Sequence, residues 1–417
     1  MSLVLTKSLS KHHLFVKAQK VIFSSLCMTD FSSAEILCGN HYPLDYIPTY
    51  LPTQLTPLHA PEMNTEQAAK LPTPDDPRWF TGAYNSTIEE LGAQLIQEEL
   101  GRKSSNMESI PESRQLPAVH QSTMTADGVT VFFRHAGPES PTAPTIVLLH
   151  GFPSSSFMFR NLIPHLALAG YRVFAPDLPG FGFTDVDPAR GYHYTFQNLA
   201  ATFEAFVDAL HLRRFALYVC DLGAPVGLRF ALRRPDALAA LVTQNGNLYR
   251  EGLARPFWAP FEAYWAQPTP SHCPPARDAL RCLVEYPATR WRYTQGSPSL
   301  ARRVSLEPCD LDQTLLDRPG IKEVQLDLFH DYRSNVELYP AFQRYLAQSV
   351  VPVLAVWGRH DPIYTPDGAV AFRRDVRDME IRWIDAGHFA LEGNEVDVAG
   401  AMCEFFDTYY IFSPLAA

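Results

Sequence analysis

The sequence predicts an α/β protein with a mostly parallel, doubly wound sheet of about eight strands and an inserted helical segment. Two observations support this prediction. Short, fully apolar runs such as 215–219 alternate with segments whose apolar residues recur at helical spacing, as in 196–210. Strands that are apolar throughout are typical of parallel sheets covered by helices on both faces.

The composition is that of a globular protein with a sizeable core. The chain has 417 residues, of which 46% are hydrophobic and 19% charged, and its formal net charge is −10. This negative charge argues against nucleic acid or an anionic membrane as the main partner. No apolar run is long enough to span a membrane. The aromatic and apolar composition of residues 246–345 implies a small, apolar or aromatic-bearing molecule as the partner; the sequence does not define an oligomeric state.

The cysteines and residues 1–29 indicate in which cellular compartment the protein is expected. Seven cysteines show no Cys-x-x-Cys spacing, which favours reduced thiols in the cytoplasm over a zinc site or a disulfide framework. Residues 1–29 contain four Lys and no Asp or Glu. A mitochondrial presequence is the alternative, although such presequences usually contain Arg and this segment has none.

Residues 1–115 form a first zone that is dense in Pro between Pro43 and Pro77. We expect a partly disordered extension here, without catalytic residues. One helix is predicted over Ser86–Arg102, because its apolar residues fall on one face and acidic residues occupy its first turn.

From residue 116 the alternation begins, with Asp127-Gly128 predicting the tight turn of a hairpin. It is interrupted by a segment rich in Trp, Tyr, Pro and Arg, which predicts a helical cap over 246–345 inserted into a core of 116–245 and 346–417. The predicted strands are 116–124, 129–134, 144–149, 172–175, 215–219, 238–243, 351–357 and 380–384, and the predicted core helices are 157–169, 196–210, 224–233, 366–375 and 395–409.

Asp221 is the most informative residue of the chain. It lies between an apolar strand and an apolar-periodic helix, at the apex of one sharp turn. A nucleophile elbow has this layout and exposes its side chain at the N-terminus of the helix. A carboxylate at that position attacks carbon and forms an alkyl ester, whereas serine would form an acyl ester. The alternative reading is a simple helix N-cap.

Three further segments also follow predicted strands. They are His150-Gly-Phe-Pro153, Trp357-Gly-Arg-His-Asp361 and Asp385-Ala-Gly-His388. The carboxyl ends of parallel strands meet at one edge of a sheet, where ligands bind, so these segments should converge on Asp221. Asp361 as a turn residue and His388 as a core histidine are the alternatives for the last two segments.

The region from about 116 to 410 resembles the α/β-hydrolase family, whose chain order is nucleophile, acid, histidine. Within that family it is similar to the epoxide hydrolase and haloalkane dehalogenase branch, which uses an aspartate nucleophile. The resemblance implies that Asp221 attacks an electrophilic carbon and that His388, held by Asp361, activates water against the ester. It also implies an oxyanion hole formed by the backbone N–H groups of Phe152 and Leu222. Neither a cofactor nor a metal is expected.

The leaving group separates epoxide from halide chemistry. A halide needs N–H donors beside the nucleophile, and the side chains of Phe152 and Leu222 cannot donate. An epoxide oxygen needs O–H donors, which family epoxide hydrolases supply as two cap tyrosines. The segments around Tyr264 and Tyr332 resemble these, with Tyr249 and Tyr293 as substitutes.

We therefore predict a hydrolase that opens an epoxide to a vicinal diol through a covalent ester on Asp221. A dehalogenase of an alkyl halide or halo-acid is the second reading. A non-catalytic binding or biosynthetic-helper protein on the same fold is the third.

Overall fold

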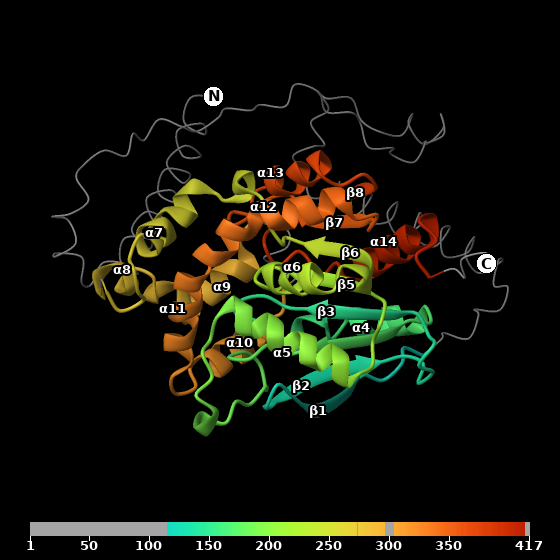
Figure 1. Ribbon diagram of the computed structural model, residues 1–417, viewed down its shortest axis with the longest axis horizontal. Helices are drawn as coiled ribbons and strands as arrows, with labels where there is room; N and C mark the ends of the chain where they lie inside the picture. The colour runs from blue at the N-terminus through green and yellow to red at the C-terminus, as the bar shows by residue number, and fades with distance from the viewer. Residues whose placement is uncertain (1–114, 273, 297–303, 413–417) are drawn as a thin grey trace, which may run out of the picture. The chain divides into compact units, whose positions relative to one another are not determined.

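The computed structural model describes residues 115–272, 274–296 and 304–412 (Figure 1). The predicted extension, with its helix at Ser86–Arg102, lies outside these residues except for Gln115.

Eight strands form one sheet in the order β1-β2-β4-β3-β5-β6-β7-β8. β1 and β2 form the predicted antiparallel hairpin, β2 also pairs antiparallel with β4, and every other neighbouring pair is parallel. The predicted mostly parallel sheet is therefore confirmed. The strands are β1 (His120–Ala126), β2 (Val129–Ala136), β3 (Thr145–Leu149), β4 (Arg172–Pro176), β5 (Phe215–Cys220), β6 (Leu238–Gln244), β7 (Val353–Gly358) and β8 (Met379–Ile384).

Helices cover both faces of the sheet (Figure 1). In β3, Ile146 and Leu148 belong to the core cluster that includes residues of α4 (Leu162–Leu168) and α14 (Glu395–Thr408). Val147 and Leu149 belong to the cluster that includes residues of α5 (Phe196–Ala209) and α6 (Gly223–Arg233). All four β3 side chains are fully buried. Because successive side chains of a strand point to opposite faces, a strand buried on both sides must be apolar throughout.

The helix predicted over 157–169 is divided. A short 3-10 turn spans Ser156–Phe159, and α4 begins only at Leu162. The cause is Pro164, which lacks an N–H group and whose ring would clash with the carbonyl of Arg160 in a continuous helix. Near the N-terminus of a helix the missing N–H costs nothing, so the helix begins two residues before Pro164.

The chain between β6 and β7 is helical, and its described residues contain no strand. In Figure 1, α7 to α11 gather at one end of the sheet. The α-helices of this segment are α7 (Arg255–Trp265), α8 (Pro274–Asp278), α9 (Tyr286–Thr294), α10 (Glu307–Leu316), α11 (Ile321–Asp331) and α12 (Arg333–Gln348). After β7, the chain forms α13 (Pro366–Ala371) before it enters β8.

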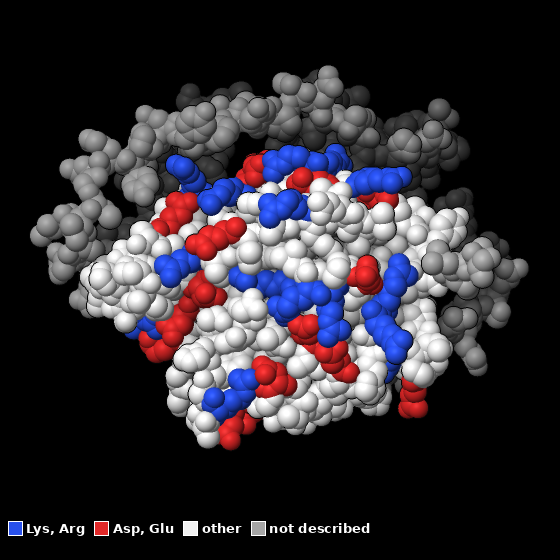
Figure 2. All heavy atoms as spheres, viewed as in Figure 1, with Lys and Arg blue, Asp and Glu red and all other residues white. Residues whose placement is uncertain are grey.

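Lysine, arginine and acidic side chains are interspersed on the face seen in Figure 2. Arg234, for example, pairs with both Glu204 and Asp208 across the α5–α6 surface. None of the described helices combines the length and apolarity needed to cross a membrane.

Candidate active site

Asp221 occupies a strained turn between β5 and α6. Its φ angle is 47°, in the left-handed region that non-glycine residues rarely adopt. The turn packs closely against the chain at the end of β3, because a Cβ atom at Gly223 would lie 2.6 Å from the carbonyl oxygen of His150. A Cβ atom at Gly227 would lie 2.8 Å from Val219 Cγ1. Small residues in the first turns of α6 therefore let the helix pack closely against the strands.

The Asp221 carboxylate has two different environments. Its Oδ1 accepts a hydrogen bond of 2.8 Å from the backbone N–H of Phe152. Its Oδ2 lies 3.5 Å from Nε2 of His388. The approach to the loop after β3 requires glycine at 151, since a Cβ atom there would lie 2.3 Å from Asp221 Cβ. The side chain thus points toward the imidazole at 388, and only 7% of the residue is exposed.

His388 is held from its other side by Asp361. The Nδ1 atom lies 2.9 Å from Asp361 Oδ2, which places the proton of the neutral ring on Nδ1 and the lone pair of Nε2 toward Asp221. The same Oδ2 accepts a bond of 2.6 Å from the side-chain amide of Asn245, and Oδ1 accepts one of 2.7 Å from the N–H of Ile363. The three predicted residues Asp221, Asp361 and His388 are therefore brought together in a buried chain of contacts.

Asn245 is a site residue that the sequence pattern did not reveal. It follows β6 and also has a positive φ of 47°. Its Oδ1 accepts from the N–H of Gly358 at 3.1 Å while its amide donates to Asp361. Asn245 therefore links the ends of β6 and β7 and fixes the orientation of the Asp361 carboxylate.

The charges around His388 control its protonation. Burial lowers the pKa of His388, but the carboxylates of Asp361 and Asp221 more than offset this, so that the net effect raises the pKa to about 9. The imidazole is therefore a cation at neutral pH. Asp385, the acidic residue nearest to His388 in sequence, does not contact it; its exposed carboxylate bonds to His360.

The loop after β3 is braced by His150. Its Nε2 accepts a bond of 2.9 Å from the N–H of Leu178, and its Nδ1 lies 3.1 Å from the carbonyl of Gly151. Burial lowers the pKa of His150 and keeps the ring neutral. His150 therefore has a structural role, in which it fixes the loop that carries Phe152.

A small cavity lies beside Asp221. The centre of a water molecule can occupy about 30 Å³ of it. Its lining is mainly aromatic, with one carboxylate and one guanidinium. The lining residues are Phe152, Asp221, Leu222, Phe257, Trp258, Phe261, Arg292, Phe329, Tyr332, Ile363 and Tyr364.

Tyr332 is one of these residues, and its hydroxyl belongs to a buried chain. Tyr364 donates to it over 3.0 Å, and the hydroxyl of Tyr339 lies 3.0 Å from it. Tyr339 in turn lies 3.5 Å from the side-chain amide of Asn247. Burial, together with the charge of Asp221, raises the pKa of Tyr332 well above its ordinary value, as it does for Tyr364. Both phenols therefore remain protonated donors. Tyr364 was not predicted, although it stands only three residues after Asp361.

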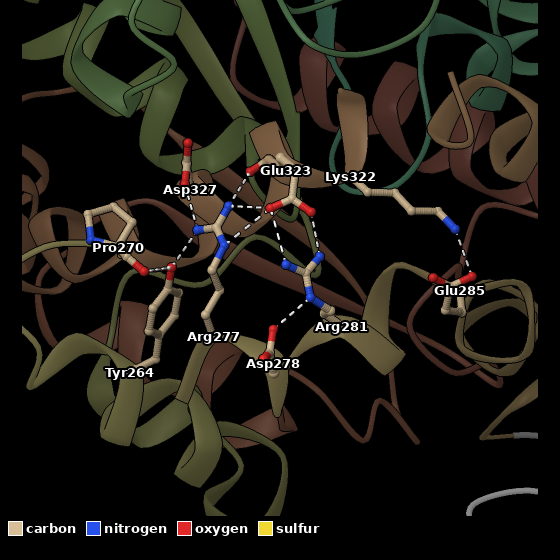
Figure 3. A network of polar contacts seen from close by, with 9 residues as sticks. All are labelled: Tyr264, Pro270, Arg277, Asp278, Arg281, Glu285, Lys322, Glu323 and Asp327. Carbon is tan, nitrogen blue, oxygen red and sulfur yellow. Dashed lines mark hydrogen bonds and ion pairs between the residues drawn. The ribbon is translucent and has the colours of Figure 1, made fainter. Parts of the chain in front are cut away.

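Tyr264 was predicted as the partner of Tyr332, and the structure places its hydroxyl elsewhere. It donates to the carbonyl of Pro270 and accepts from Arg277 at 2.8 Å (Figure 3). Arg277 also pairs with Glu323 and Asp327. Tyr264 does not line the cavity. The place of Tyr264 on α7 directs its ring toward His330 and this polar network. The prediction of Tyr264 as an epoxide-oxygen donor is therefore corrected.

The two substitute tyrosines also point away from the cavity. Tyr249 donates to Asp375 at 3.0 Å, and Tyr293 donates to Asp312 at 2.6 Å. Within the described ranges, no group of three or more His, Cys, Asp or Glu residues is arranged to hold a metal ion.

Comparison with known proteins defines the family. Residues 144–395 match the model of the alpha/beta hydrolase fold. The chain belongs to the α/β-hydrolase family. The matched range begins at the residue before β3 and ends at the start of α14, so it includes all the residues that converge at the cavity.

The relatives within this family have different names. An uncharacterized hydrolase of Saccharomyces cerevisiae is 43% identical over 283 residues, which is 67% of this chain and 94% of the yeast protein. A haloalkane dehalogenase of Mycobacterium marinum is 31% identical over 59% of this chain and 78% of its own length. Epoxide hydrolase 3 of Siraitia grosvenorii is 33% identical over 32% of this chain and 41% of its own length. The α/β hydrolase is thus similar to enzymes of both chemistries.

Proposed function

We propose that this α/β hydrolase opens a small epoxide to a vicinal diol by way of an ester on Asp221. The residues 246–345 act as a cap that supplies the aromatic side of the cavity. Asp221, His388 and Asp361 act as a catalytic triad. Tyr332, supported by Tyr364, donates a proton to the epoxide oxygen.

In the first step, Asp221 Oδ2 attacks a ring carbon. The new carbon–oxygen bond forms as the ring carbon–oxygen bond breaks, and the departing oxygen takes the proton of Tyr332. This proposal uses Oδ2 as the nucleophile because Oδ1 already accepts the N–H of Phe152. A hydrogen bond from Tyr364 makes the hydroxyl of Tyr332 a better donor, because it stabilises the developing phenolate.

Ester formation then changes the state of His388. The ester removes the negative charge of Asp221, one of the two charges that raise the pKa of His388. The imidazolium can now return a proton to the Tyr332 phenolate, which leaves the neutral imidazole needed as a base. His388 takes a proton from water, and the hydroxide attacks the ester carbonyl carbon. The ester carbon–oxygen bond then breaks, and the departing diol oxygen takes a proton from the imidazolium. The proton of the re-formed Asp221 carboxyl group passes to His388, so that the carboxylate and the imidazolium are both restored.

The oxyanion of this second step forms on Oδ1. The N–H of Phe152 already bonds to that atom, and the N–H of Leu222 is the second predicted donor. A donor of this kind typically contributes about 3 kcal/mol to transition-state stabilisation.

The observation that favours an epoxide concerns the hydrogen bonds that Trp258 and Tyr332 make at the cavity. Trp258 is the tryptophan that lines it, and its indole N–H is donated to the carbonyl of Ile363 at 3.0 Å. That indole N–H is therefore not available to a leaving halide. The Tyr332 hydroxyl receives a hydrogen bond and has a proton to give, which suits an alkoxide.

A purified preparation tests this proposal with the small compounds 1,2-epoxypropane and bromoethane. We expect diol from the epoxide and no bromide from the halide. Bromide release without diol would establish the dehalogenase reading instead. A protein that turns over neither compound, and whose properties do not change on Asp221→Ala, would fit the non-catalytic reading.

A further inference from the structure

A buried arginine shares the cavity with Asp221. Arg292 lies on α9, is 3% exposed and lines the cavity. Its Nη1 donates to the carbonyl of Leu283 at 3.0 Å, and its guanidinium lies 4.8 Å from the centre of the Phe152 ring. Among the described residues, this is the one hydrogen bond that the Arg292 side chain makes. A guanidinium has five N–H donors, so most of its capacity is available to a ligand.

The buried guanidinium is a cation at neutral pH. Burial lowers the pKa of Arg292 to about 10, against the opposing attraction of Asp221. Withdrawing such a group from water is costly unless a partner compensates it. Besides the attraction of Asp221, its partners among the described residues are the ring of Phe152 and a single carbonyl, which points to a ligand as a further partner.

The charges near the cavity leave room for an anion. His388 lies between the carboxylates of Asp221 and Asp361, whereas no carboxylate of the described residues lies within ion-pair distance of the Arg292 guanidinium. Arg292 is the one cation in the cavity lining, and the residues beside it are aromatic. An anionic group would therefore be attracted to one defined place, while the rest of a small substrate contacts apolar rings.

We propose that Arg292 binds the carboxylate of the substrate, and that the natural substrates are small oxirane-carboxylic acids. This rests on the proposed epoxide hydrolysis. The planar fork of a guanidinium matches a carboxylate with two parallel hydrogen bonds. The small volume of the cavity favours a compact substrate, in which the carboxylate lies close to the oxirane.

Two substrates of equal size test the proposal. Glycidate carries the carboxylate, and glycidamide replaces it with a neutral amide. We expect kcat/KM of the wild type to be about 10- to 100-fold higher for glycidate, since a charge-assisted pair is worth that much. Arg292→Gln should bring the ratio to one or below, because Asp221 then repels the anion. Arg292→Lys should keep part of the preference.

Arg290→Gln is the matched control, since Arg290 lies exposed on the same helix; its ratio should equal that of the wild type. If Arg292 serves only as a counter-ion to Asp221 or as packing for Phe152, Arg292→Gln slows the hydrolysis of both substrates equally. The ratio of kcat/KM for glycidate to that for glycidamide is then the same as in the wild type. That result, or a wild-type ratio near one, would overturn the proposal. Each ratio is measured on one preparation, so a partly folded variant does not alter it.

Calorimetry tests the anion site at Arg292 independently of the proposed epoxide hydrolysis. Propanoate and propanamide cannot be opened, and their binding to the full chain needs no turnover. We expect propanoate to bind about tenfold or more tightly than propanamide, and Arg292→Gln to remove the difference. If neither epoxide is hydrolysed while propanoate is still preferred, the reaction is wrong and the anion site stands. If glycidamide is hydrolysed and propanoate is not preferred, the anion site is wrong.

Discussion

The two sides of the cavity are built in different ways. On the sheet side, Asp221, Asp361 and His388 follow strand ends and are fixed by backbone and side-chain hydrogen bonds at 2.6 to 2.9 Å. On the helical side, Trp258, Phe261 and Phe329 line the cavity and pack against one another, with few polar groups between them.

This difference suggests that the sheet side holds the reacting groups and that the helical side selects the substrate. Hydrogen bonds between strand ends hold the proposed nucleophile, base and acid to fixed distances, which the proposed covalent mechanism requires. Aromatic packing defines a shape and admits a few polar groups, here Tyr332 and Arg292, that decide which substrate fits. Mutations on the sheet side should therefore remove turnover, whereas those on the helical side should change which substrate is turned over.

The largest effect is expected from Asp221→Ala, which removes the proposed nucleophile. Diol formation should fall by about 10⁴-fold or more, as it does for essential catalytic groups in other hydrolases. Asp385→Ala is the control, because Asp385 is exposed and its carboxylate is bonded to His360, away from His388. Steady-state assays of both variants check this, and comparable activities would remove the basis for the sheet side as the reaction centre.

The stability of the protein should depend on the protonation of His388. Its folded pKa of about 9 lies above its ordinary value of 6.5. The resulting stabilisation is therefore fully present below about pH 6.5 and is lost as the pH rises through about 9. The loss in the free energy of unfolding is on the order of 3 kcal/mol.

Denaturant unfolding of the wild type and of His388→Gln across this pH range measures that loss. Other buried groups titrate in both proteins, among them Asp312, whose pKa burial raises to about 7. The difference between the two curves isolates His388. Parallel curves would show that the carboxylates do not hold His388 as a cation.

Tyr332→Phe should lower kcat for epoxides by about 100-fold, the usual contribution of a general acid. Tyr264→Phe should change it less than twofold, because its hydroxyl is bonded to Pro270 and Arg277 outside the cavity. This pair compares two positions on the helical side that the sequence pattern did not distinguish. Equal losses in both variants would show that the cavity rearranges to admit Tyr264.

Asn245→Ala should have a smaller effect, a decrease in kcat of about tenfold with an unchanged KM. Asn245 orients Asp361 and does not line the cavity, so the loss should come from a less fixed imidazole. Michaelis profiles separate the two constants. An increase in KM alone would place Asn245 in substrate binding.

The sheet side could be predicted from the sequence because its geometry follows from strand order. The residues after β5, β7 and β8 meet wherever those strands lie parallel, so Asp221, Asp361 and His388 could be named together. Asn245 could not be found in this way, since an Asn after a strand is common in turns. Tyr364 had a signal, its position three residues after Asp361, but it lies outside the predicted cap, which is the part of family epoxide hydrolases that supplies the two tyrosines.

The helical side was less predictable. Tyr264 and Tyr332 looked alike in sequence, and the direction of each ring depends on how α7 and α11 pack, which no local pattern specifies. Arg292 lay in a segment with many arginines, and only burial distinguishes it from exposed Arg290. Residue type suggests chemistry, but on helices tertiary packing decides which side chain reaches the cavity.

The central claim is that Asp221 forms a covalent ester with carbon. A single turnover in oxygen-18 water, followed by mass analysis of the peptide around residue 221, tests it most directly. The account predicts a mass increase of about 2 Da in that peptide, because water attacks the ester carbonyl and one labelled oxygen stays in the carboxylate. Label in the diol and none in Asp221 would mean direct attack of water on the epoxide and would contradict the account.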